Sequence, residues 1–365
     1  MKEQTRIQSQ RNTNLEVFRI LTMLLIVAHH YVVNSGLSGI IYANPYRIRS
    51  LFLFVFGAWG KTGINCFLLI TGYFMCKSHI TVKKYAKLYL ELVFYKVVIY
   101  ILFSITGYSE FTIMGLIDCC VGFLRYVGTG FFCAYLLFYL YIPFLNILIH
   151  NISKKQHLLL ILLSSYIYIA LSTWRNASVT MNYISWFCVL YFISAFIRLY
   201  PIPVLENTRI TGLSTVLVIV LATVSVILGA TSENSKNAFY YVADSNKILA
   251  VLVALSAFLF FKNVQIRYSP LLNRIASSTF GVLCIHANSD AMRKWLWVDV
   301  LKNTQIYEMS AIVVVSHAVI SVITVFCVCT VLDQLRICLL EKPFFKLWDV
   351  TALKLKSIKH DQSLT

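Results

Sequence analysis

The sequence has few charged residues. Asp, Glu, Lys and Arg together make up 13% of the 365 residues, whereas 59% are hydrophobic. Soluble domains typically carry about 25% charged residues, so the composition excludes an ordinary soluble globular protein. The chain also has only 6 prolines and 14 glycines, and no Pro- or Gly-rich linker interrupts it. These features predict a polytopic membrane protein without a soluble domain at either end.

Metal-binding and nucleotide-binding motifs are also lacking. The 10 cysteines lie almost all within apolar segments and show no metal-ligand spacing with histidine or carboxylate residues, which favours small packing side chains over disulfide or metal chemistry. A net charge of +17 is often a sign of nucleic-acid binding. Here the basic residues lie in short connections between apolar runs, so we expect membrane lipids and no nucleic acid as partners.

Ten apolar windows are long enough to cross a hydrocarbon core of about 30 Å. They lie near residues 14–33, 60–76, 88–106, 129–149, 157–173, 183–200, 211–230, 247–261, 275–289 and 309–332. We therefore predict an all-α transmembrane helical bundle with about ten spans. Residues 111–124 form a shorter segment that contains Asp118, which favours a re-entrant or interfacial position, and an eleventh crossing stays open.

Lys and Arg residues are distributed unequally between the alternate connections. With ten crossings, the side that holds the N-terminus has visibly more of them, so we predict that both termini are cytoplasmic and that the protein is a multi-pass protein of the cell membrane. The first apolar run is too long for a signal peptide and is expected to stay as an uncleaved span. We predict a transmembrane domain over residues 1–340 and a basic cytoplasmic tail over 341–365.

The first apolar window carries ionisable residues at both of its ends. Glu16, Arg19 and His30 lie on one helical stripe, because the eleven residues from Arg19 to His30 rotate the helix about 20° past three full turns. His29 is turned roughly 80° away from Arg19. Ionisable groups in a lipid-spanning helix are costly and usually functional. The stripe predicts an ion pair between Glu16 and Arg19, with His30 as the better candidate for a general base.

Four sequence stretches together resemble the acyltransferase-3 family, membrane O-acyltransferases that modify sugars of bacterial surface polysaccharides. Glu16-Val-Phe-Arg19 followed by His30 resembles the signature of the family's first helix. Residues 63–74 resemble a Phe-rich segment that closes on Ser-Gly-Tyr, with Thr71 in place of the serine. Residues 135–146 also fit, and residues 278–286 resemble a helix rich in Ser and Phe that ends in histidine, here His286. The resemblance covers residues 12–340.

This resemblance implies a membrane-bound O-acyltransferase that moves an acyl group, which we expect to be acetyl, from acyl-coenzyme A to a hydroxyl of a cell-surface or exopolysaccharide sugar or its lipid-linked precursor. His30 is expected as the catalytic base. Arg19 is expected to hold a donor phosphate or to stabilise the oxyanion, with Glu16 orienting it. No bound cofactor or metal is expected, and acetyl-CoA or another acyl-CoA serves as co-substrate.

Further contacts with the two substrates follow from the same resemblance. Lys84 and Lys87 stand where the family commonly has an Arg-x-x-Arg pair before a proline, and lysines contact donor phosphates as point charges rather than as bidentate forks. His286, Thr71 and Tyr73 are expected to bind substrate. The topology puts His286 in the same layer of the membrane as His30, where it is expected to orient the acceptor sugar or the catalytic histidine. Ordinary cytoplasmic lysines remain an alternative interpretation for the basic pair.

Two alternatives from other classes remain. A transporter or flippase of lipid-linked oligosaccharide would use the charged stripe to bind a pyrophosphate, but such proteins often contain structural repeats, and none is visible here. A polysaccharide polymerase would need a large outer loop, and the outer loops are short. An acyl-histidine intermediate and direct transfer both agree with the sequence. The acyl group and the acceptor sugar also stay open.

Overall fold

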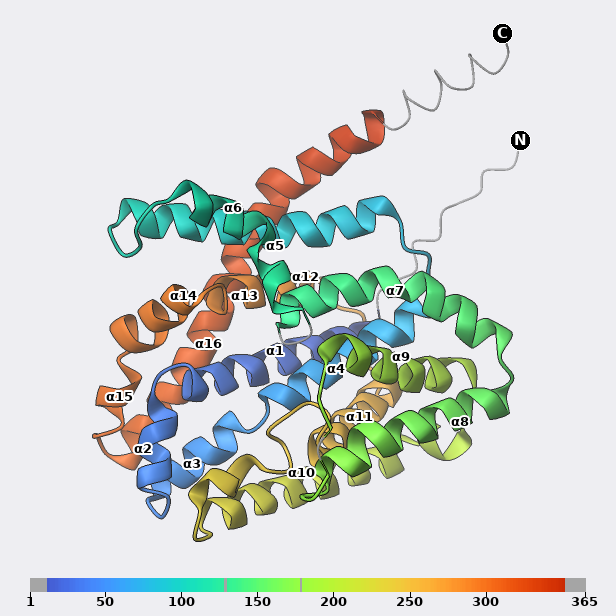
Figure 1. Cartoon of the computed structure of the whole chain (residues 1–365), viewed down its shortest axis with the longest axis horizontal. Helices are drawn as coiled ribbons and strands as arrows, with labels where there is room; N and C mark the ends of the chain where they lie inside the picture. Colours follow the sequence, from blue (N-terminus) through green and yellow to red (C-terminus); the bar gives the residue numbers. More distant parts are fainter. Residues whose placement is uncertain (1–11, 128–129, 178, 352–365) are drawn as a thin grey trace.

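The computed structural model describes residues 12–127, 130–177 and 179–351, and every regular element within these ranges is helical (Figure 1). The α-helices, in chain order, are α1 (Thr13–Val33), α2 (Leu37–Ala43), α3 (Ile48–Gly57), α4 (Gly60–Met75), α5 (Val82–Ile105), α6 (Ile113–Val121), α7 (Phe131–Asn151), α8 (Lys154–Ser165), α9 (Tyr183–Leu199), α10 (Thr208–Ala230), α11 (Ile248–Asn263), α12 (Pro270–Ser277), α13 (Thr279–His286), α14 (Asp290–Lys294), α15 (Asn303–Ile306) and α16 (Ala311–Arg336).

Six helical stretches in the described part of the chain are long and apolar enough to cross a membrane. They are Thr13–Val33, Ile48–Met75, Val82–Ile105, Phe131–Asn151, Thr208–Ala230 and Ala311–Thr351. Two shorter apolar helices, α9 and α11, accompany them. The all-α prediction is thus confirmed, and the protein is a multi-pass membrane protein.

Long apolar runs predict most helices to within a few residues, and the exceptions are where a run is interrupted. The predicted second window begins at residue 60, but α3 precedes it and is separated from α4 by only two residues. A ten-residue helix is too short to cross a bilayer alone, so a length criterion overlooks it. The window 275–289 is not one helix: α12 and α13 are short and are separated at Ser278.

The C-terminal part of the chain continues the last long helix. After α16, a π-helical turn (Ile337–Glu341) leads into further helix up to Thr351. The boundary expected at residue 340 therefore falls within a continuous helical stretch. Residues 352–365 of the predicted basic tail lie outside the described residues.

Helix α1 lies at the centre of the bundle and packs against α3, α4, α11, α12, α13 and α16. Glycines permit its close approach to α4. A β-carbon at Gly63 would lie 2.6 Å from Cγ1 of Ile26, and one at Gly60 would collide with the His29 ring. Small residues of this kind let transmembrane helices pack at short distance. In the ionisable stripe of α1, Glu16 is buried and Arg19 and His30 are half-buried.

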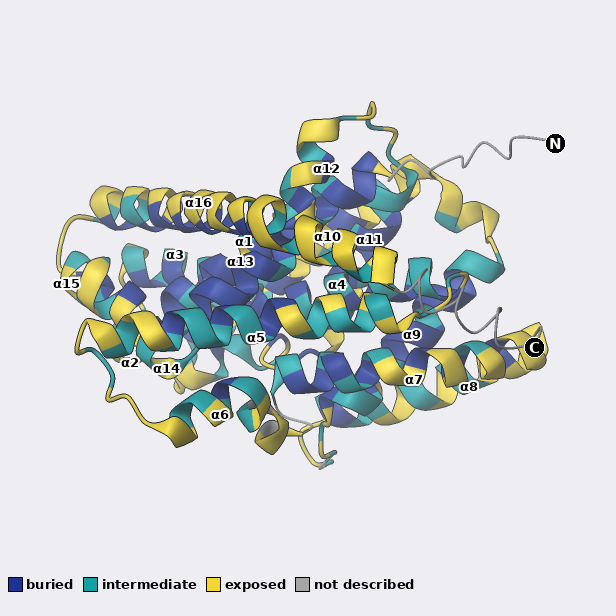
Figure 2. Cartoon of the chain, turned by 90° about the horizontal axis from the view of Figure 1, so that it is seen from above, coloured by how far each residue is buried: buried dark blue, intermediate teal, exposed yellow. Residues whose placement is uncertain are grey.

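Side-chain burial follows this arrangement. Figure 2 shows α13 and much of α1 buried, whereas the outward faces of α10 and α16 are exposed. The exposed side chains on these outer helices include Leu213, Val216, Ile312 and Ile320. In a membrane protein such apolar faces contact lipid rather than water. The polar groups that matter for chemistry are therefore found inside the bundle.

Candidate functional site

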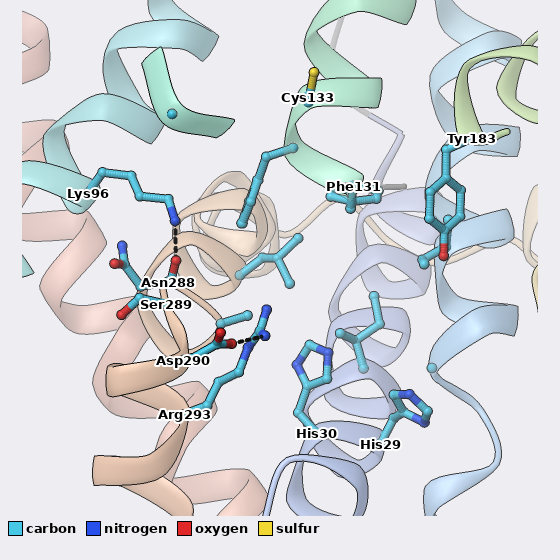
Figure 3. A pocket seen from close by; sticks show the side chains of 18 of the residues that line it. His29, His30, Lys96, Phe131, Cys133, Tyr183, Asn288, Ser289, Asp290 and Arg293 are labelled. Atoms are coloured by element: carbon cyan, nitrogen blue, oxygen red, sulfur yellow. Dashed lines mark hydrogen bonds and ion pairs between the residues drawn. The ribbon is translucent and has the colours of Figure 1, made fainter. Parts of the chain in front are cut away.

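A pocket of about 590 Å³ lies beside the C-terminal end of α1. Its lining includes His29 and His30 from α1, and further residues come from α4, α5, α6, α7, α9, α13, α14 and the segment between α6 and α7 (Figure 3). Charged side chains line it from several of these elements. His30 lines this pocket, so its side chain borders open space.

His30 is hydrogen bonded to a second histidine. Nδ1 of His30 lies 2.9 Å from Nε2 of His286, and the ring centroids are 5.1 Å apart. His286 is completely buried at the end of α13 and also contacts the indole ring of Trp297 edge-on. The two histidines that the sequence predicts in one layer of the membrane are therefore in direct contact.

The partners of this pair fix the protons on both rings. Nδ1 of His286 lies 2.6 Å from the backbone oxygen of Val282, which only accepts, so Nδ1 carries a hydrogen and donates it. In the neutral ring Nε2 of His286 is then an acceptor, and Nδ1 of His30 must donate to it. Neutral His30 thus keeps an unprotonated Nε2, which is the atom that a general base needs.

The contacts of His29 indicate a structural role. Its Nδ1 lies 2.6 Å from the backbone oxygen of Gly57, at the end of α3. Since carbonyl groups in the last turn of a helix lack intrahelical partners, this hydrogen bond stabilises the interruption between α3 and α4. The absence of a side chain at Gly60 leaves room for the ring. Of the two adjacent histidines, His30 has the hydrogen-bonded histidine partner.

The predicted ion pair at the other end of the stripe is present. Nη1 of Arg19 lies 3.3 Å from both carboxylate oxygens of Glu16, whose side chain is only 4% exposed. The Arg19 guanidinium also lies 6.0 Å from the centre of the Phe74 ring. Arg19 does not line the pocket of His30. The stripe therefore has two separate polar ends, as the helical spacing predicts.

Thr71 and Tyr73 lie on α4, away from His30. Thr71 Oγ1 donates to the Phe67 carbonyl and lies 3.3 Å from the hydroxyl of Tyr135. The Tyr73 hydroxyl accepts from Arg198, whose guanidinium is 4.6 Å from the Tyr73 ring centre. Neither residue lines the pocket of His30, and no hydrogen bond described joins either of them to His286.

Lys84 and Lys87 lie in the first turns of α5 and already have partners. Lys84 Nζ donates to the Ser78 hydroxyl and to the His79 carbonyl. Lys87 Nζ lies 2.7 Å from a carboxylate oxygen of Glu341. Both side chains are on the same end of the bundle as Glu16 and Arg19, because α1 begins and α4 ends there.

The ion-pair partner of Glu91 differs from the one predicted from the sequence. Helical spacing predicts a pair with Lys87, four residues earlier, and this prediction is wrong. Oε1 of Glu91 lies 3.2 Å from Nη2 of Arg336, which also contacts Asp333 and Glu341. Spacing along one helix reveals only neighbours within that helix, whereas Arg336 belongs to α16.

Several charged residues of the pocket cannot be recognised as pocket residues from the sequence. Lys61, Arg125 and Arg293 all line it, yet in the sequence each resembles an ordinary basic residue near a span end. Interfacial Lys and Arg residues are common in membrane proteins, so position alone does not distinguish these three. In the described residues no group of three or more His, Cys, Asp or Glu side chains is arranged to hold a metal ion.

The fold and the site together define a polytopic membrane protein in which His30 lines a pocket and the buried His286 contacts it from behind. A family model described as an acyltransferase domain matches residues 12–333. The chain therefore belongs to the acyltransferase-3 family, and membership implies that it transfers an acyl group. Neither a curated protein nor a solved structure matches the chain.

Proposed function

We propose that the protein is a membrane O-acyltransferase that transfers an acyl group, in the first instance acetyl, from acyl-coenzyme A to a hydroxyl of a surface glycan or its lipid-linked precursor. The observation that carries this proposal is that His30, which lines the pocket of an acyltransferase-family chain, is hydrogen bonded to the buried His286. It gives a base of defined tautomer beside space for an acceptor.

The proposed topology has ten crossings and cytoplasmic termini, supported by the excess of basic residues on the N-terminal side. In this orientation Arg19 lies in the inner half of the membrane, and His30 lies about 16 Å further along the α1 axis, at its outer end. The donor is made in the cytoplasm and the acceptor is reached from outside. Arg19 thus lies toward the side of the donor, and His30 lies toward the side of the acceptor.

In the proposed reaction, Nε2 of His30 removes the proton from the acceptor hydroxyl as its oxygen attacks the thioester carbonyl. The tetrahedral intermediate then collapses, the carbon–sulfur bond breaks, and the coenzyme thiolate takes the proton from His30. His286 stabilises the imidazolium because its Nε2 accepts from Nδ1 of His30. The products are the ester and free coenzyme A, and His30 returns to its neutral form.

The separation along α1 favours a role for Arg19 in donor binding. A residue about 16 Å from His30 along the helix axis does not reach an oxyanion formed at His30, but it suits a group further along the extended coenzyme. Glu16 would hold the guanidinium in place. Lys84 and Lys87 lie close to the cytoplasmic end of α5 and would meet the coenzyme phosphates, with Lys87 released from Glu341.

The test is the ester content of surface polysaccharide, measured by proton NMR before and after mild alkali. Host cells would carry the wild type, a deletion, or His30→Ala at matched membrane levels. We expect the ester signal to vanish in the deletion and in His30→Ala while glycan yield holds. His150→Ala is the matched control, because His150 is exposed on α7 and contacts only a backbone oxygen of its own helix among the interactions described.

The same experiment separates the enzyme from a transporter. If the deletion removes the glycan itself and His30→Ala restores it fully, the protein assembles or exports glycan and the proposed chemistry is refuted. A flippase has no step that requires a general base.

A further inference from the structure

The pocket of His30 has an excess of positive charge. Its lining includes four basic side chains and two acidic ones. The basic residues are Lys61, Lys96, Arg125 and Arg293, and the acidic residues are Asp118 and Asp290. A positively charged cavity walled by apolar protein attracts anions strongly, because the surroundings screen the charge poorly.

Three of the four cations have carboxylate partners. Arg125 forms a two-pronged contact with Asp118, with N–O distances of 2.7 and 3.0 Å. Arg293 Nη1 lies 2.8 Å from Asp290. Lys61 Nζ lies 3.8 Å from Asp244, which is outside the pocket, and donates to the Tyr183 hydroxyl. These pairs account for both acids of the pocket lining.

Lys96 is the cation left without a carboxylate among the ion pairs of residues 12–127, 130–177 and 179–351. Its ammonium group donates to the backbone oxygen of Asn288 and lies 5.9 Å from the centre of the Phe132 ring. Both contacts are with neutral groups. Since Lys96 lies in the second half of α5, a membrane-length helix, its charge is costly unless an anion compensates it.

Lys96 is placed next to the histidine pair. Asn288, which it contacts, is two residues beyond His286, and both Lys96 and His30 line the pocket. In Figure 3 the side chains of Lys96 and Arg293 extend into the pocket from one side, with His30 and His29 on the other. Arg293 adds a further unmet donor, because its Nε is buried and has no hydrogen-bond partner.

We propose that the pocket binds an acceptor that carries an anionic group, a carboxylate or a phosphate, held by Lys96 and Arg293 while the reacting hydroxyl faces His30. This inference rests on the proposed function. A sugar carboxylate and the phosphate of a lipid-linked precursor present the same chemistry to an ammonium group. The site lies at the opposite end of α1 from Arg19, so it is separate from the contacts assigned to the donor.

Binding to the purified full-length chain in nanodiscs, without donor, tests the inference. The probes are methyl β-glucuronide, glucose 1-phosphate and the neutral methyl β-glucoside, and 3′,5′-ADP represents the donor phosphates. We expect one of the two anionic sugars to bind at least about tenfold more tightly than the glucoside, since a charge-assisted contact is stronger than a neutral one. Preference for the glucuronide identifies an acidic sugar, and preference for the phosphate identifies the lipid-linked precursor.

Lys96→Gln should abolish this preference and leave binding of the neutral glucoside unchanged, while Lys96→Arg should retain most of it. Lys294→Gln is the matched control, because Lys294 is exposed near the same pocket and does not line it. Equal binding of charged and neutral sugars overturns the inference, and so does a preference that survives in Lys96→Gln. If only 3′,5′-ADP binding depends on Lys96, the pocket holds the donor and the inference is also overturned.

Because this assay contains no acyl donor, its result is independent of the proposed activity. Lys96-dependent binding without ester formation in cells would refute the acyl transfer and leave the anion site in place. Ester formation without charge preference would refute the anion site and leave the enzyme in place.

Discussion

Nδ1 of His30 lies 2.9 Å from Nε2 of His286, although 256 positions separate the two residues in the chain. The backbone oxygen of Val282 fixes the proton on His286, and this contact in turn leaves Nε2 of His30 free. A single carbonyl group in α13 thereby selects the tautomer of a neutral side chain in α1. A change at His286 should therefore alter the chemistry of His30.

His286→Ala is expected to lower kcat for acyl transfer by about 10²-fold, because His30 loses the acceptor that selects its tautomer and stabilises its charged form. The KM for the donor should stay unchanged, since the proposed donor contacts at Arg19, Lys84 and Lys87 do not involve His286. His286→Gln, with an amide oxygen that still accepts a hydrogen bond, should keep more activity than His286→Ala. Steady-state kinetics of the purified variants measure the difference.

A purely structural role for His286 would give another pattern. In that case both variants would lose folded protein in proportion to activity, and the activity per folded molecule would match the wild type. Size-exclusion chromatography of the same preparations distinguishes the two cases.

Gly60→Ala tests the close approach of α4 to α1. A β-carbon there would lie 2.6 Å from Cβ of His29 and closer still to its ring. Overpacking of this kind costs roughly 1–3 kcal/mol, and moving His29 also disturbs its hydrogen bond to Gly57. We expect a lower melting temperature in detergent and reduced transfer activity.

Gly39→Ala is the control, because a β-carbon at Gly39 meets nothing within 4 Å. Alanine in a helix is favoured over glycine by about 1 kcal/mol, so this variant should be as stable as the wild type or slightly more stable. If Gly60→Ala behaves like Gly39→Ala, the contact between α4 and the His29 ring does not limit the choice of residue at position 60.

Sequence patterns predict the elements and the local contacts of this protein. The α1 window is expected at 14–33 and is found at Thr13–Val33, since an apolar run of bilayer length leaves little alternative to helix. The ion pair between Glu16 and Arg19 follows from a three-residue helical spacing and is present. Both predictions depend only on residues within one helix.

Contacts between helices are harder to predict from the sequence. The pairing of Glu91 with Arg336 depends on how α5 and α16 pack, and no spacing within either helix encodes it. Likewise, the charged lining of the pocket comes from several separate elements, so Lys61 and Arg293 look like ordinary residues of membrane interfaces. For His30 and His286 the sequence predicts only that both lie in the same layer of the membrane. The topology gives the depth of each residue in the membrane but not which helices pack against each other.

Glu16→Gln tests the enclosed ion pair of α1. Removing the carboxylate charge leaves Arg19 without its partner, and we expect a loss of about 2 kcal/mol in folding stability, the scale of a hydrogen bond to a charged group. The double variant Glu16→Gln with Arg19→Met should lose less than the sum of the two single variants, because no isolated charge then remains. Strictly additive losses would show that the two residues are not coupled.

The last prediction concerns Arg336, which is in contact with three carboxylates. Glu91, Asp333 and Glu341 all lie within 3.2 Å of its guanidinium nitrogens, and Arg336 and these three side chains are at most 8% exposed. Arg336→Met would leave three buried carboxylates with too little compensating charge. Breaking a buried ion pair costs about 3–5 kcal/mol, so we expect little folded protein in the membrane fraction.

The exposed pair of Lys83 and Asp349 provides the matched comparison, since its N–O distance is also short, at 2.7 Å, but the side chains are 41% and 58% exposed. Asp349→Ala should cost no more than about 1 kcal/mol. Combining Arg336→Met with Glu91→Leu and Asp333→Leu should recover part of the yield, because apolar side chains need no counter-charge. Equal yields of Arg336→Met and Asp349→Ala would show that burial does not raise the cost of unpairing these charges.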